Sequence, residues 1–82
     1  MKELEKYNRA FEKTFKVQID ETIENLNQKS LLAWDSLGQM RLISAIESEF
    51  GIMLKMDDIK KFTSYKAGIE ILKKYNVVIN LE

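Results

Sequence analysis

Apolar residues recur along the first part of this chain at steps of three and four, the spacing that places side chains on one face of an α-helix. The stretch runs from residue 2 to about residue 16. Its apolar positions are Leu4, Tyr7, Ala10, Phe11 and Phe15. Glu5 and Arg9 are spaced to form an ion pair along such a helix. We therefore predict a long amphipathic helix whose aromatic stripe belongs to a core.

A second helical pattern covers residues 36–50 and begins with a cap. Asp35 is a favoured N-cap residue, so Ser36 should occupy the first helical position. Trp34, just before the cap, is placed to pack back onto Gln39 or Met40 as a hydrophobic staple. Gly51 follows the last periodic residue and suits a left-handed C-terminal position.

The two flanks of this second helix differ. At about 100° per residue, Leu42, Ile43, Ile46 and Phe50 fall on one stripe and should enter the core. The other flank, beside the serine, carries Leu37, Met40, Ser44 and Glu47. Large apolar groups beside a projecting hydroxyl indicate a docking surface built around Ser36, although isolated exposed apolar residues are also common on ordinary surfaces.

The segment between the two helices, residues 17–29, is open to two interpretations. Val17 and Ile19 alternate as in a strand, whereas Asp20 could cap a single helical turn that follows it. A connector of this length needs apolar anchors of its own. The candidate anchors are Ile23, Leu26, Leu31 and Leu32.

Two further helices are predicted after Gly51. Residues 57–62 read as a short helix with acids at its start and lysines at its end, and Ile59 and Phe62 facing inward. Thr63 or Ser64 then caps a last helix over residues 64–75, in which Gly68 allows close packing against a neighbour. Its buried side should carry Tyr65, Ala67 or Gly68, Ile69 and Leu72. We expect a single domain over residues 1–82, an all-α small four-helix bundle with a long first loop and a short third helix.

Composition narrows the classes of function. The 82 residues include 45% hydrophobic and 32% charged residues, as in ordinary globular domains, with no apolar run long enough to span a membrane and no signal-peptide pattern. Thirteen basic and thirteen acidic residues leave no net charge, which disfavours a nucleic-acid binder. The absence of histidine and cysteine removes the usual transition-metal ligands and the commonest general base, and no set of nucleophile, acid and base can be assembled from the residues present. We therefore expect a cytoplasmic protein that is not an enzyme. We also expect it to be a monomer.

The segment Asp35-Ser36-Leu37, preceded by Trp34, opens a helix that closes in Glu47-Ser48-Glu49-Phe50-Gly51-Ile52. With a short helix and a final helix at the expected distances, this arrangement resembles the phosphopantetheine attachment region of acyl carrier proteins. The resemblance extends over essentially the whole chain, most strongly over residues 34–72 and least over residues 17–29.

The resemblance implies that Ser36 carries a 4′-phosphopantetheine arm through a phosphodiester, with an acyl group held on the arm's thiol as a thioester. Asp35 and Leu37, on either side of the attachment point, would be the other cofactor-binding residues. The implied partners are a phosphopantetheinyl transferase and acyl-activating and acyl-transferring enzymes, in lipid, polyketide or polysaccharide biosynthesis. The residues expected to contact these partners are Leu37, Met40, Arg41, Ser44 and Glu47.

The sequence also departs from the family's usual pattern. Carriers of the fatty-acid type are typically strongly acidic, but here Gly38 and Arg41 stand where acids are frequent, and only Glu47 and Glu49 remain on the docking helix. This indicates a specialised, stand-alone carrier. Ile43, Ile46, Leu54, Phe62 and Ile69 would line any cavity for the acyl group, but such residues line every helical core. The alternative function is a helical protein-interaction module that is never modified.

Overall fold

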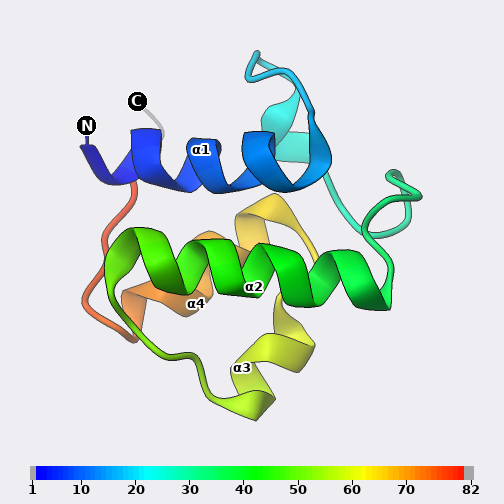
Figure 1. The fold of residues 1–82 in the computed structure, drawn as a ribbon. Coiled ribbons are helices and arrows are strands. Elements are labelled where there is room, and N and C mark those ends of the chain that lie inside the picture. Colours follow the sequence, from blue (N-terminus) through cyan, green and yellow to red (C-terminus); the bar gives the residue numbers. More distant parts are fainter. Residues whose placement is uncertain (1, 81–82) are drawn as a thin grey trace.

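The computed structural model describes residues 2–80, and Figure 1 shows the arrangement of the helices. They are α1 (Lys2–Phe15), the short 3₁₀ helix η1 (Ile23–Asn25), α2 (Ser36–Phe50), α3 (Met56–Lys61) and α4 (Tyr65–Lys73). Over these residues the fold is all-α, with four α-helices and no strand, which confirms the predicted fold class. Residues 1, 81 and 82 of the predicted domain lie outside the described residues.

The ends of the helices are set by local chemistry. Asp35 caps α2, and Ser64 caps α4 by accepting a hydrogen bond from the Ala67 N–H. Gly51 ends α2 in the left-handed conformation, with φ of 64°. Lys16 (φ 58°) and Asn76 (φ 64°) adopt left-handed conformations after α1 and α4. The helical turns therefore stop at Phe15 and Lys73, and residues 74–76 form a turn.

The core is built on the aromatic stripe of α1, which packs chiefly against α2. Tyr7, Phe11 and Phe15 are buried, and the Phe11 ring lies edge-on to Trp34 and to Tyr65, with centroids 5.5 and 5.2 Å away. The Tyr7 hydroxyl donates to the backbone oxygen of Tyr65 at 2.6 Å. Burial raises the pKa of Tyr65 to about 12. The aromatic stripe thus joins α1 to the loop before α2 and to α4.

Gly68 permits a close approach of α4 to Tyr7 and Phe62 within this core. A Cβ atom at this position would lie 2.2 Å from the Tyr7 hydroxyl and 2.3 Å from the Phe62 ring. The expectation that Gly68 serves close packing is therefore confirmed.

Of the two interpretations of the long first loop, the structure shows the helical turn after Asp20. The Asp20 carboxylate accepts hydrogen bonds from the backbone N–H and the hydroxyl of Thr22, and η1 follows. Leu26 then accepts a hydrogen bond from the Tyr65 N–H, next to an isolated bridge between Asn27 and Ser64. These contacts fasten the loop to the start of α4.

Two expectations from the sequence are wrong. Three of the four proposed loop anchors contact the core, but Leu32 is 95% exposed. Arg9 does not pair with Glu5 along α1, because its guanidinium reaches across to the Glu49 carboxylate of α2 at 3.0 Å. A long side chain can satisfy its charge on a neighbouring helix as easily as on its own.

A buried carboxylate holds the short helix α3 against the end of α4. Asp58 is 5% exposed and accepts hydrogen bonds from the Lys74 ammonium at 2.8 Å and the Tyr75 hydroxyl at 2.6 Å. The hydrogen bond from Lys74, followed by that from Tyr75, lowers the pKa of Asp58 below its ordinary value. Nothing in the hydrophobic pattern pointed to this contact.

This contact makes stability depend on pH. A carboxyl group with a lowered pKa in the folded state stabilises the fold above the ordinary Asp pKa of about 3.9, and that stability is lost as the pH falls through the folded-state value. We expect Asp58→Asn to unfold at a lower temperature than the wild type at pH 7, and the difference to shrink below about pH 4. Thermal unfolding followed by circular dichroism measures this. Asp57→Asn, an exposed neighbour, is the control, and a wild-type-to-variant difference that stays constant from pH 7 to pH 3 would contradict the account.

Candidate functional site

The candidate site centres on Ser36, the first residue of α2. The Asp35 carboxylate accepts a hydrogen bond from the Gly38 N–H at 2.9 Å, and the Asp35 backbone oxygen accepts one from Gln39 at 2.7 Å. The predicted cap is thus present. It fixes the first turn of α2 and with it the direction of the Ser36 side chain.

The Ser36 hydroxyl is exposed and makes no hydrogen bond to another described residue. The cap also leaves the backbone N–H groups of Ser36 and Leu37 without an acceptor in the described part of the chain. Free N–H groups and the positive end of the helix dipole favour an anion at this position. The local geometry therefore suits a serine that carries a negatively charged group.

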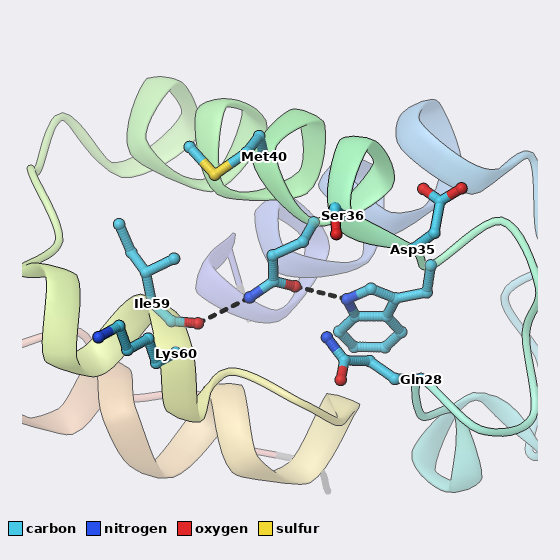
Figure 2. A pocket seen from close by; sticks show the side chains of 8 residues that line it. Gln28, Asp35, Ser36, Met40, Ile59 and Lys60 are labelled. Carbon is cyan, nitrogen blue, oxygen red and sulfur yellow. Dashed lines mark hydrogen bonds between the residues drawn. The ribbon is translucent and has the colours of Figure 1, made fainter.

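Trp34 and Gln39 connect the serine's loop to α3. Trp34 is 2% exposed and lies against Phe11 and Phe15 of α1. Its indole N–H donates to the Gln39 side-chain oxygen at 2.6 Å, and the Gln39 side-chain nitrogen donates to the Ile59 backbone oxygen at 2.7 Å. These two bonds are the dashed lines in Figure 2. We call this arrangement the Trp34–Gln39–Ile59 bridge.

The bridge refines one prediction. Gln39 was one of two proposed partners for a Trp34 staple, and it is the partner, but through a hydrogen bond rather than an apolar contact. The role of Gln39 toward α3 could not be read from the sequence, because its acceptor lies twenty residues away on a different element.

Gly38 is required by the backbone that crosses behind it. A Cβ atom there would lie 2.0 Å from the Ala33 backbone oxygen and 3.1 Å from the Phe15 ring. The glycine at this position is therefore explained by packing. It lets the loop pass close enough to α2 to bury Trp34.

A cleft of about 580 Å³ opens beside the serine, between the start of α2 and α3. Figure 2 shows its walls, with Ser36 and Met40 on the α2 side and Ile59 and Lys60 on the α3 side. It is lined by Gln28, Trp34, Asp35, Ser36, Gln39, Met40, Ile59 and Lys60. Lys60 is exposed and forms no ion pair with another described residue, so it contributes a positive charge to the cleft.

The predicted partner-contact residues share the face of α2 next to this cleft. Leu37 and Met40 are 61% and 53% exposed, and Arg41 and Ser44 are exposed as well. Glu47 lies farther along α2 and is half-buried. Its carboxylate accepts a hydrogen bond from the Leu54 N–H at 2.9 Å. Ser36 and the two apolar side chains are therefore presented together.

The two acids of α2 are both engaged within the chain. Glu47 binds the Leu54 amide, and Glu49 is paired with Arg9 of α1. Among the described residues, no group of three or more histidine, cysteine or acidic side chains gathers as in a metal site. None of the helices in residues 2–80 has the length and apolar character needed to cross a membrane.

The residues predicted from the sequence to line an acyl cavity lie apart from the cleft beside Ser36. They belong to the buried core and none of them lines the cleft beside Ser36. They are Ile43, Ile46, Leu54, Phe62 and Ile69.

Comparison with known proteins gives one match. Residues 29–72, more than half of the chain, match the family described as phosphopantetheine attachment site. The matched segment contains the cap, the serine, α2, α3 and most of α4. Searches of curated proteins and of solved structures gave no match.

Gly38 gives a test of how the site is held. In an ordinary helix interior, Gly→Ala stabilises by up to about 1 kcal/mol. Here the Ala33 oxygen blocks the added methyl group, so we expect Gly38→Ala to destabilise the protein by about 1–3 kcal/mol. Urea denaturation measures the free energy of unfolding. Ser44→Ala, at an exposed position of the same helix, is the control, and equal stabilisation in both variants would refute the close contact.

Proposed function

The chain belongs to the family of phosphopantetheine attachment domains, and we propose that it is an acyl carrier protein that delivers acyl groups from an arm on Ser36 to partner enzymes. The family's cofactor is 4′-phosphopantetheine, attached covalently. The observation that carries the proposal is an exposed serine hydroxyl at the capped start of α2, beside a cleft and inside the matched segment. When bound, the arm supplies a thiol that holds an acyl group as a thioester.

The residues around Ser36 fit a phosphodiester. The unpaired N–H groups of Ser36 and Leu37 can donate to its oxygens, and a charge at the helix N-terminus is stabilised by about 0.3–1 kcal/mol when exposed. Lys60 adds a positive charge on the facing wall of the cleft. The Asp35 carboxylate, the one acid in the cleft lining, is turned to the Gly38 N–H.

In this proposal Ser36 is a substrate of another enzyme and the chain itself is not an enzyme. The serine oxygen forms a bond to the β-phosphorus of coenzyme A, the bond from that phosphorus to the nucleotide breaks, and 3′,5′-adenosine bisphosphate leaves. The hydroxyl proton passes to a base of the transferase, because no described side chain hydrogen-bonds to the Ser36 hydroxyl. Asp35 holds the first turn so that the hydroxyl projects. We place these steps in the cytoplasm, where coenzyme A is available.

We propose that partners dock on the α2 face next to the cleft. Leu37 and Met40 supply the apolar contact, and the flexible thioether of Met40 can adapt to more than one surface. Arg41 and Ser44 set orientation, with Glu47 at the edge. A small contact of this kind suits a carrier, whose complexes must form and dissociate repeatedly.

The first test is modification itself. We expect the protein to gain the mass of one phosphopantetheine when incubated with coenzyme A, Mg²⁺ and a broad-specificity phosphopantetheinyl transferase. Ser36→Ala should show no gain in intact mass, and Ser48→Ala, which changes an exposed serine of the same helix outside the proposed docking face, should be modified like the wild type. Failure of folded wild-type protein to gain mass with several transferases would favour the unmodified interaction module.

The second test addresses the docking face, with the transferase as the probe. Leu37→Asp should lower kcat/KM for modification by roughly tenfold or more, because loss of an apolar anchor that the partner buries costs about 1.4 kcal/mol of binding or more. Val78→Asp is a matched control, since Val78 is similarly exposed (58%) and lies outside both α2 and the cleft lining. Equal rates for both variants, with unchanged thermal stability, would remove Leu37 from the docking surface.

A further inference from the structure

An acyl group on Ser36 has two possible places to lie, between α2 and α3 in the helical core or outside in the cleft. The side chain that separates these two places is Gln39. It is three residues after Ser36 and so lies next to it on the same face of α2. A chain that passes from Ser36 into the core between α2 and α3 has to pass this side chain.

Gln39 is held at both ends of its amide. Its nitrogen donates to the Ile59 backbone oxygen at 2.7 Å, and its oxygen accepts from the Trp34 indole at 2.6 Å. Gln39 is only 9% exposed and Trp34 is 2% exposed. The bridge is therefore a buried connection from the loop, through α2, to α3, across the inner side of the cleft.

Moving Gln39 aside would leave polar groups without partners. The Trp34 indole N–H and the Ile59 carbonyl would then face an alkyl chain, which can neither donate nor accept a hydrogen bond. In the described part of the chain, every buried side-chain nitrogen and oxygen has a hydrogen-bond partner. Entry of an aliphatic chain would therefore leave buried polar groups without hydrogen-bond partners.

The core next to the bridge offers little compensation. Leu42, Ile46 and Phe62 have no exposed surface, and Ile43 has only 2%. Interiors packed in this way accommodate added methylene groups only by displacing neighbours. By contrast, the cleft on the outer side of the bridge already offers about 580 Å³, with polar groups from Gln28, Gln39 and Lys60 in its lining.

We propose that the Trp34–Gln39–Ile59 bridge keeps the acyl group out of the helical core, so that this carrier takes short acyl groups or acyl groups with polar substituents, which stay in the cleft beside Ser36. The proposal rests on the carrier function proposed above. It concerns the class of cargo, and it can fail while that function holds.

The experiment compares a short and a long cargo on the wild-type protein. A broad-specificity transferase transfers acetyl- or octanoyl-phosphopantetheine from the corresponding acyl-coenzyme A, and intact mass verifies loading. The rate of thioester cleavage by hydroxylamine and the unfolding temperature are then measured. A chain in the core would be shielded from the nucleophile, so we expect cleavage rates of the two forms to agree within about twofold. Their unfolding temperatures should also agree.

Two variants test the bridge as the cause. Gln39→Ala removes the amide, and Trp34→Phe removes one hydrogen bond while keeping an aromatic ring against Phe11 and Phe15. In at least one of them, shown to be folded by circular dichroism, octanoyl cleavage should become about tenfold slower than acetyl cleavage, because the opened path admits the chain. Gln18→Ala, which changes an exposed glutamine in the first loop, is the control and should behave as the wild type.

The outcomes separate the two proposals. No loading of Ser36 would overturn the carrier function and this inference with it. Loading followed by strong protection or stabilisation of the wild-type octanoyl form would overturn the inference alone. Equal rates of cleavage for the acetyl and octanoyl forms, in the wild type and in both folded variants, would show that the bridge is not what excludes the chain. That result would also overturn the inference.

Discussion

The position of the cleft depends on one buried amide, the side chain of Gln39. It hydrogen-bonds to the loop through Trp34 and to α3 through Ile59. Each such bond contributes about 0.5–1.5 kcal/mol, but loss of the amide would leave its partners unsatisfied at a higher cost. Helix α3 has only six residues and cannot be stable by itself. Its place opposite Ser36 therefore comes from contacts of this kind, together with the Asp58 contacts to Lys74 and Tyr75.

The serine is positioned from the other side by α1. Phe11 and Phe15 contact the Trp34 ring, and Gly38 lets the Ala33 backbone approach α2. The N-cap follows directly in the chain. Aromatic packing in the core thus places Ser36 on the surface. The sequence features responsible are the aromatic stripe of α1, the tryptophan before the cap and the glycine after it.

The sequence predicted the features that are local in the chain. Periodicity identified α1, α2 and α4, and the acids and lysines at its two ends identified the short α3. Asp35 and Gly51 marked the ends of α2, and Ser64 was one of two candidate caps for α4, because caps act within a few residues. The contacts that shape the site are long-range. Gln39 and Ile59 are twenty residues apart, and Arg9 and Glu49 are forty apart. A hydrophobic pattern gives the inward face of each helix but not the partner of a polar side chain, and for the same reason it could not show that Leu32 is exposed.

The charge of the α2 face also follows from such contacts. The chain has no net charge, yet its charges are not equally available, since Glu47 binds the Leu54 amide and Glu49 binds Arg9. Near the exposed Leu37 and Met40, the charge left free on α2 is the cation of Arg41. A partner that relies on basic residues to attract an acidic carrier would find like charge there, which costs association rate and affinity. Recognition of this face has to come from its apolar contacts and from acceptors that can bind an arginine. The α2 face therefore lacks free negative charge for two reasons. The chain as a whole has no net charge, and folding engages the two acids of α2 in contacts within the chain.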